Sequence, residues 1–271
     1  MNAPTNPGSP NPAGQAAAAA PIAAIADLFE ATPTAHAVRT YADGGKTYTL
    51  VQTEPEYRAL LATLQGQSVW AFDTETDGLD PLEAGMVGFS VAWEDHRAVF
   101  VRLPDETQAC KAWLELLRPL ICDPSRTLIG HNLKFDLQVL AGYGLYPQGS
   151  LRDTMLAHYL LDPDGKHGLD MLSEQYLHYR PIPIEDLIGI KETKGNKTPQ
   201  KNMRDVPNEV LAVYAAEDAD ITRLLYAVLE PEIEKLGQKD LFVDVDCRLV
   251  PVLAAMEREG IRLDTKVLRE F

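Results

Sequence analysis

Cysteine, basic residues and long apolar runs are all scarce in this sequence. Its three cysteines, Cys110, Cys122 and Cys247, lie far apart among the 271 residues. They provide neither the closely spaced ligands of a zinc site nor the framework of a disulfide-bonded secreted domain. No apolar run approaches the roughly 20 residues that a membrane-spanning helix needs, and the first ten residues lack the early positive charge of a signal peptide. We therefore expect a cytoplasmic protein in a reducing environment, with no membrane partner.

Basic side chains are outnumbered, because 25 lysines and arginines face 40 aspartates and glutamates and give a formal net charge of −15. This charge excludes a broad positive surface, so nucleic acid could be bound only through metal ions and a few local lysines. A phosphate-binding loop is also missing. Gly45-Lys46-Thr47 matches the end of that motif, but Thr40 stands where the motif requires a glycine.

The remaining composition is that of a globular protein with a sizeable core, 45% hydrophobic and 24% charged. The length suggests one large domain or two modest ones. Residues 1–45 differ from the rest, since they hold six prolines and an alanine run but only four charged side chains. We expect a disordered leader over residues 1–45, containing at most a short helix over Ala23–Ala31, and ordered structure from Lys46 onward.

Beyond the leader, apolar periodicity predicts strands and helices in alternation. Strands are expected at residues 46–51, 68–75, 86–93, 98–103 and 127–130. Helices are expected at residues 54–65, 107–120, 133–143, 154–161, 168–179, 208–229, 244–259 and from 265. Strands that come early, followed by helices mixed with single strands, indicate an α/β fold with a mixed sheet. In such sheets, functional sites gather at the carboxyl ends of the strands.

The stretch from Ala71 to Asp80 carries the clearest chemical signal. It reads as a strand that ends in a turn at Asp77-Gly78. Asp73 and Glu75 are two residues apart, so on a strand they point to the same face. Adjacent carboxylates repel each other as they lose water, and a cation between them removes the conflict. Hard divalent cations such as Mg²⁺ or Mn²⁺ suit an all-oxygen site, while a solvated acidic strand end is the alternative.

Two later segments can bring further side chains to this strand end. Asn132 can cap a helix in which Asp136 lies one turn from the start. Tyr214 and Asp218 are four residues apart on a later helix, so they share a face. Taken singly, Asp136 could equally be a surface acid and Tyr214 a half-buried aromatic.

Three other acids are not expected to belong to this site. Glu217 and Asp220 lie on other faces of the helix that carries Asp218, and we expect them to be solvated. Asp153 precedes a helical pattern and is expected to serve as its N-cap.

The motifs Asp-x-Glu, Asn-x-x-x-Asp and Tyr-x-x-x-Asp, in this order, resemble the three-motif signature of the DEDDy exonucleases. The surrounding sequence is similar to the proofreading (3′→5′ exonuclease) domains of bacterial DNA polymerase I. The stretches that carry the resemblance are FDTETDGLDP, IGHNLKFD, DTMLAHYLLDPDGKHGLDMLSEQYL, MRDVP and YAAEDADIT. The resemblance covers residues 47–271, and LVPVLAAMEREGIRLD is similar to the opening of the polymerase domain in that family.

This resemblance implies a ribonuclease H-like mixed sheet flanked by helices. It implies an exonuclease domain over residues 46–238 and the truncated, helical start of a polymerase domain over residues 239–271. The expected partners are a single-stranded or frayed 3′ end of DNA and the polymerase domain of the same gene product, missing here. The protein would act as a monomer, beside the nucleoid of a bacterial cytoplasm, in DNA replication and repair.

The resemblance also implies a two-metal hydrolysis of phosphodiester bonds. Asp73, Glu75 and Asp218 would hold one divalent cation, and Asp73 with Asp136 would hold a second, both Mg²⁺ or Mn²⁺. One cation would activate the attacking water and the other would stabilise the leaving 3′ oxygen. Tyr214 would orient the water by a hydrogen bond, since a pKa of about 10 makes tyrosine a poor base at neutral pH.

Substrate contacts follow from the same resemblance. Leu79 matches a family position whose apolar side chain wedges against the terminal bases, although an ordinary core leucine is the alternative. Asn132 and Phe135 would line the channel for the strand, and Phe135 stands where many relatives have tyrosine. A lysine-rich loop could touch phosphates or could be merely solvated. Its lysines are Lys191, Lys194, Lys197 and Lys201.

Two other functions are compatible with these motifs. One is an RNA-trimming exonuclease like ribonuclease D, which has the same DEDDy site but not the polymerase-like tail. The other is a catalytically silent strand-binding module, although all four acids and the tyrosine are present here.

Overall fold

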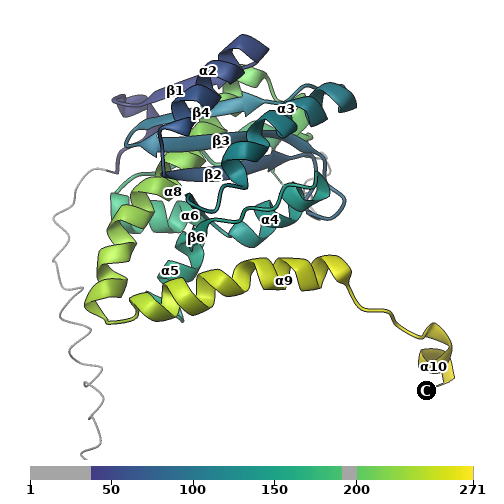
Figure 1. The fold of residues 1–271 in the computed structure, drawn as a ribbon. Coiled ribbons are helices and arrows are strands. Elements are labelled where there is room, and N and C mark those ends of the chain that lie inside the picture. Colours follow the sequence, from purple (N-terminus) through teal and green to yellow (C-terminus); the bar gives the residue numbers. More distant parts are fainter. Residues whose placement is uncertain (1–37, 191–199, 271) are drawn as a thin grey trace, which may run out of the picture. The chain divides into compact units, whose positions relative to one another are not determined.

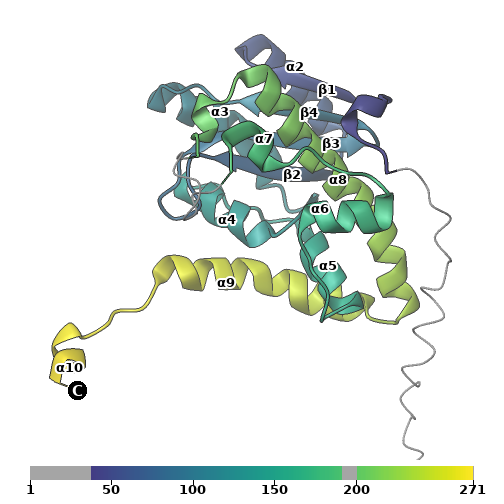
Figure 2. The ribbon, with the colours of Figure 1, turned by 180° about the vertical axis from the view of Figure 1, so that it is seen from behind.

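The computed structural model describes residues 38–190 and 200–270. The helix expected over Ala23–Ala31 and the loop lysines Lys191, Lys194 and Lys197 lie outside the described residues. From Val38 onward the described chain forms a six-stranded sheet with helices on both of its faces (Figures 1 and 2). Among the described helices, none is both long enough and apolar enough to cross a membrane.

The sheet is mixed, as expected from the sequence. Its strands lie in the order β1-β4-β3-β2-β5-β6. The parallel pairs are β1 with β4, β2 with β5, and β5 with β6, whereas β3 runs antiparallel to both of its neighbours. The bounds are β1 (Thr47–Val51), β2 (Val69–Thr76), β3 (Met86–Glu94), β4 (Arg97–Arg102), β5 (Thr127–Gly130) and β6 (Ser150–Asp153).

The α-helices occupy both sides of this sheet. Helices α2 and α3 cover one face, and the long helix α8 crosses the other, where it packs against β1 to β5 (Figure 2). The bounds are α2 (Glu54–Gln65), α3 (Thr107–Ile121), α4 (Leu133–Gly142), α5 (Thr154–Leu161), α6 (Leu169–Leu172), α7 (Ile184–Ile188), α8 (Asn208–Lys235), α9 (Cys247–Glu259) and α10 (Thr265–Glu270). Short 3₁₀ turns are η1 (Tyr41–Asp43) and η3 (Met203–Asp205), and π-helical segments are η2 (Ser173–Leu177) and η4 (Leu241–Asp246).

The two faces of strand β2 differ in the size of their side chains. Trp70 and Phe72 belong to a large cluster with the stacked pair Tyr57 and Trp113, whose ring centroids are 4.8 Å apart. Ala71 lies on the opposite face. There it joins a cluster of small residues from the sheet and from α8, namely Ala71, Ala92, Ala98, Ile129, Ala216 and Ala219. Small side chains on both partners let the helix backbone approach the sheet closely, so α8 is held at a fixed place on this face.

Several expected boundaries are wrong. Strand β6 was not expected, because its sequence, Ser-Leu-Arg-Asp, has one apolar residue and shows no strand pattern. The short helix α7 was likewise not expected. The single helix expected over residues 168–179 is instead one turn of α6 followed by the π-helical η2. Helix α8 was expected to end at Leu229 but continues past Pro231, because Ile233 extends the buried row of Leu225 and Leu229.

The start of ordered structure also lies earlier than Lys46. Arg39 pairs with the Tyr179 region, since its amide donates to the His178 carbonyl at 2.9 Å and its carbonyl accepts from the Arg180 amide at 2.8 Å. The turn η1 then leads into β1. Residues 38–45 are therefore attached to the domain by backbone hydrogen bonds.

The helix starts at α4 and α5 depend on one buried carboxylate. Asp153 caps α5, as expected, by accepting hydrogen bonds from the amides of Met155 and Leu156. It also accepts from the amides of Asn132 (3.2 Å) and Leu133 (2.8 Å) at the start of α4. The expectation that the Asn132 side chain caps α4 is wrong: Asn132 is left-handed, with φ of 62°, and its side chain makes no cap bond.

This double cap gives the first prediction. Asp153→Ala removes the acceptor of four amides at a buried position, and we expect the free energy of unfolding to fall by about 2–4 kcal/mol. Asp153→Asn should lose less, because its side-chain oxygen can replace the one that accepts three of the four bonds. Urea unfolding followed by circular dichroism measures both.

A matched control is Glu106→Ala, which removes an exposed N-cap that accepts two amides of α3. We expect that variant to lose about 1 kcal/mol. A loss at Asp153 no greater than the loss at Glu106 would show that the shared cap does not hold the two helices.

Candidate active site

Three acids from two elements meet at the end of strand β2. Asp73 and Glu75 continue the face of β2 that carries Ala71, so they point toward helix α8. Asp218 lies on α8 next to Ala219 of the small-residue cluster. The structure brings these three side chains together, with one carboxylate oxygen of each within 4.8 Å of the others. The packing of α8 on the sheet therefore assembles the cluster.

Asp136 joins this site from helix α4. It is 3% exposed, and its Oδ1 accepts hydrogen bonds from the amide of Thr74 (2.9 Å) and from the Thr74 hydroxyl (2.6 Å). Thr74 lies between Asp73 and Glu75 but on the other face of the strand. The surface-acid alternative for Asp136 is thus wrong. Thr74 is a site residue that the sequence argument missed, although its place between the two acids was a visible signal.

Burial is the largest cause of the raised pKa values of all four carboxyl groups. Burial, followed by the charges of Asp136 and Asp218, raises the pKa of Asp73 well above its usual range. The pKa of Glu75 is raised well above its usual range by burial and then by the charge of Asp73. The pKa of Asp218 is raised in the same way by burial and then by the charge of Glu75. Burial raises the pKa of Asp136 to about 7, against the two hydrogen bonds from Thr74. The cluster therefore favours any partner that supplies positive charge.

The donor set fits a divalent cation. All the converging ligands are carboxylate oxygens, the type that Mg²⁺ and Mn²⁺ prefer. Tyr214 lies one turn before Asp218 on α8, and burial, then the Asp218 charge, raises the pKa of its hydroxyl well above the usual value. Tyr214 therefore stays protonated at neutral pH and can donate a hydrogen bond into the site.

The acids line a cavity of about 400 Å³ that also contains the expected substrate residues Leu79, Asn132, Phe135 and Lys201. Leu79 is 88% exposed at this cavity, so the core-leucine alternative is wrong. Gln200, Asn202 and Met203 line the same cavity and were missed as individual residues.

The turn after β2 is fixed by a salt bridge that the sequence argument did not foresee. Arg204 Nε lies 2.7 Å from Asp77 Oδ2, and the Asn202 amide group donates to the Asp77 carbonyl at 2.8 Å. The amide of Gly85 donates to Asp77 Oδ1 at 2.6 Å. These contacts hold the base of the loop that carries Leu79.

The expectation that Glu217 and Asp220 are solvated is wrong. Both are fully buried on α8. Asp220 accepts hydrogen bonds from Tyr48 Oη (2.9 Å) and Lys46 Nζ (3.1 Å), and Glu217 accepts from the hydroxyl of Tyr179. The alanines surrounding these acids were the available signal, because they predict a helix buried on more than one face.

Comparison with known proteins agrees with this geometry. Residues 48–234, more than half of the chain, match the 3′-5′ exonuclease family of DNA polymerase A. The chain belongs to this family. One similar protein is DNA polymerase I of Rhizobium leguminosarum, 35% identical over 232 residues that cover 77% of this chain. The chain spans about a quarter of the length of the DNA polymerase I relatives that it matches, 22% in this case.

Solved structures show the same fold as this exonuclease domain. Pol1 of M. smegmatis, in complex with DNA primer-template and dNTP, aligns with a TM-score of 0.63 at 19% identity, over 82% of this chain and 34% of its own. Brucella melitensis NrnC with bound Mg²⁺ aligns with a TM-score of 0.55 at 21% identity, over 83% of this chain and 95% of its own. Escherichia coli RNase D aligns with a TM-score of 0.56 at 21% identity, over 80% of this chain and 52% of its own. The ribonuclease H-like mixed sheet expected from the sequence is thereby confirmed.

The raised pKa of Asp136 generates a prediction for the metal-free protein. In the unfolded chain this carboxyl ionises near its ordinary pKa of about 4, whereas in the fold it ionises at about 7. Between these values the folded state binds more protons, so the free energy of unfolding falls as pH rises through this window. We expect the decrease in the free energy of unfolding between low and high pH to be smaller in Asp136→Asn than in the wild type, by on the order of 2–4 kcal/mol.

The measurement is chemical unfolding in a chelator at pH 4.5, 6 and 8. Asp164→Asn, which neutralises an exposed acid, is the control for the change in net charge. Parallel pH dependences for the wild-type protein and Asp136→Asn would contradict the prediction.

Proposed function

We propose that this domain removes nucleotides from the 3′ end of DNA by metal-dependent hydrolysis, as a proofreading exonuclease. The observation that carries the proposal is the convergence of Asp73, Glu75 and Asp218 beside Asp136 in a cavity. Repulsion among four carboxylates disfavours such a cluster unless it holds cations. The similarity to DNA polymerase I proteins supports DNA as the substrate.

Two cations, Mg²⁺ or Mn²⁺, are the expected cofactors. Asp73, Glu75 and Asp218 would hold one, and Asp73 with Asp136 would hold the other. When bound, the pair supplies the charge that activates the attacking water and stabilises the leaving 3′ oxygen. A similar fold has been solved with bound Mg²⁺, which supports the choice of ion.

The remaining roles belong to side chains of the cavity. Tyr214, kept protonated by its raised pKa, would orient the attacking water by a hydrogen bond. Leu79 would pack against the terminal bases and keep the 3′ end unpaired, while Asn132 and Phe135 would line the path of the strand. Lys201 would contact a phosphate, and we extend this role to the loop residues Lys191, Lys194 and Lys197.

We further propose that residues 46–238 form the catalytic unit and that residues 239–271 belong to the start of a polymerase domain. Helix α9 supports this division, because it packs on α4 and β6 yet leaves Leu249, Val252 and Met256 exposed. A polymerase domain would cover these side chains, and the protein would then work as a monomer on DNA of the nucleoid in the cytoplasm.

A 5′-labelled single-stranded DNA oligonucleotide tests the activity. With Mg²⁺ or Mn²⁺ we expect a ladder that shortens one nucleotide at a time from the 3′ end. Asp73→Ala and Asp218→Ala should each slow it more than about 100-fold, since each removes a metal ligand. Asp164→Ala is the matched control with an unchanged rate. Intact DNA in the presence of a folded, metal-loaded protein would contradict the proposal.

An RNA oligonucleotide of the same sequence separates this function from RNA trimming, because the 2′-hydroxyl is what distinguishes the two substrates. Faster degradation of the RNA than of the DNA would favour the ribonuclease D-like alternative. Binding of strands without cleavage would favour the silent module.

Leu79 gives a prediction about substrate form. Because its side chain is 88% exposed, Leu79→Ala should leave stability unchanged within about 0.5 kcal/mol. Loss of the wedge should slow digestion of a mispaired duplex end about tenfold and that of single-stranded DNA much less. Equal effects on both substrates would remove the proposed role. Leu82→Ala, at another exposed leucine, is the control.

A further inference from the structure

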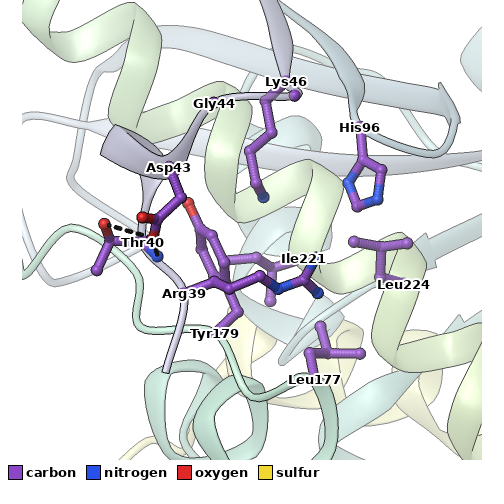
Figure 3. Close-up of a pocket in the computed structure, with 11 residues that line it drawn as sticks. Arg39, Thr40, Asp43, Gly44, Lys46, His96, Leu177, Tyr179, Ile221 and Leu224 are labelled. Carbon is purple, nitrogen blue, oxygen red and sulfur yellow. Dashed lines mark hydrogen bonds between the residues drawn. The ribbon is translucent and has the colours of Figure 1, made fainter. Parts of the chain in front are cut away.

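A second cavity, of about 300 Å³, is lined by residues different from those of the acidic site. It lies between the segment that precedes β1, the turn between β3 and β4, and helix α8 (Figure 3). Residues from four parts of the chain line it, from Arg39 to Lys46, His96, Leu177 with Tyr179, and Ile221 with Leu224. No role in the proposed reaction uses this cavity.

Lys46 places a buried ammonium group at this cavity. Its side chain is 6% exposed, and Nζ lies 3.1 Å from Asp220 Oδ2 and 3.7 Å from the ring centroid of Tyr179. The charge of Asp220 is thereby balanced. An ammonium has three N–H donors, and within the described residues only one acceptor is bonded to this group. Lys46 therefore retains donor capacity at the cavity.

Arg39 places an exposed guanidinium group at this cavity. Its backbone is fixed by the hydrogen bonds to His178 and Arg180, so the residue is held at the cavity. Among residues 38–190 and 200–270, no side chain forms an ion pair or hydrogen bond with its guanidinium group. Among the described lining residues the acid is Asp43, which is bonded to Thr40 and not to Arg39: its Oδ2 accepts from the amide (2.6 Å) and hydroxyl (3.2 Å) of Thr40. The guanidinium group points among the side chains of the lining in Figure 3.

The imidazole ring of His96 is a third nitrogen-bearing group at this cavity. Its amide donates to Asp220 Oδ1 at 2.8 Å, which fixes the turn, and its Nδ1 lies 3.6 Å from Asp220 Oδ2. Leu177, Ile221 and Leu224 form the aliphatic part of the wall. Gly44 and Gly45 leave open space, since a Cβ on either would meet no atom within 4 Å.

Unused cationic donors above an apolar wall match a small organic anion with a flat, weakly polar body. Arginine forms paired hydrogen bonds with phosphate oxygens, and aliphatic walls accept the faces of a base. We propose that this cavity binds a nucleoside monophosphate, with the phosphate on Arg39 and Lys46 and the base against Leu177 and Leu224. The choice of nucleotide rests on the proposed function, because a 3′→5′ exonuclease releases this product.

Calorimetric titration of dAMP and dTMP into the full chain in EDTA tests the proposal. The chelator removes the metal that the acidic site needs, and Asp218→Asn alters that site directly. We expect the nucleotides to bind both in EDTA and to Asp218→Asn. Arg39→Met should weaken this binding about tenfold or more. Arg58→Met, at an exposed arginine of α2 paired with Glu54, is the matched control and should bind as the wild type. The Arg39 side chain makes no bond in the described structure, so its replacement does not endanger folding.

Deoxyadenosine and inorganic phosphate, titrated separately, test whether both halves of the ligand are recognised. Each should bind at least about tenfold more weakly than dAMP. No binding of dAMP at millimolar concentration, binding lost in Asp218→Asn but kept in Arg39→Met, or equal binding of deoxyadenosine would each overturn the proposal. If the protein degrades DNA but does not bind dAMP at this cavity, only the proposal for the cavity is contradicted. If it binds dAMP here but does not degrade DNA, the proposed function is contradicted and the cavity remains a binding site.

Discussion

The close packing of helix α8 on the alanine face of the sheet is the contact on which the site depends. Asp218 and Tyr214 have a fixed position relative to Asp73 and Glu75 only because Ala216 and Ala219 allow the helix backbone to approach β2, β3 and β4. A larger side chain in this cluster would have to move the helix, since cores at native density have no room for added methylenes. The geometry of the acidic cluster therefore depends on alanine residues that contribute no ligand atoms. The acids occupy the ends of elements whose spacing the alanines determine.

This arrangement holds four carboxyl groups whose pKa values are raised by burial, and for Asp73, Glu75 and Asp218 the charges of neighbouring acids raise the pKa further. Apolar packing elsewhere in the fold must offset this electrostatic cost, and the opposite face of the sheet carries an aromatic cluster in which Tyr57 stacks on Trp113 and Phe72 packs near Phe89. Thr74 connects the two faces, because its side chain lies on the face opposite Asp73 and Glu75, while its backbone amide and its hydroxyl both donate to Asp136. A functional site that opposes stability is thus supported by packing one layer away.

The sequence was sufficient where the deciding interaction was local. Asp73 and Glu75 share a face because strand residues two apart always do, and Tyr214 shares a face with Asp218 because helix residues four apart do. It was insufficient where a distant group competed with a local one. Asn132 was expected to cap α4, but its side chain makes no cap bond, and the buried carboxylate of Asp153, 21 positions later, accepts from the amides of Asn132 and Leu133. Glu217 and Asp220 were assigned to solvent because α8 was treated as a helix with one buried face. Its middle is enclosed by the sheet and by α5, α6 and η2.

The buried charges on α8 illustrate why such residues persist although a charge pair adds little net stability in a protein interior. Lys46 stands immediately before β1, at the edge of the sheet, and Asp220 lies on the helix that crosses the sheet, so their ion pair joins these two elements. Tyr48 and the amide of His96 bind the same carboxylate, which adds β1 and the β3–β4 turn to the constraint. Alanine packing sets how closely α8 approaches the sheet, and the directional hydrogen bonds around Asp220 add a constraint on its position along the sheet. Asp220 lies two residues after Asp218, so a network that fixes the former also restricts the latter. Specificity of placement, more than stability, is what this buried group contributes to the acidic site.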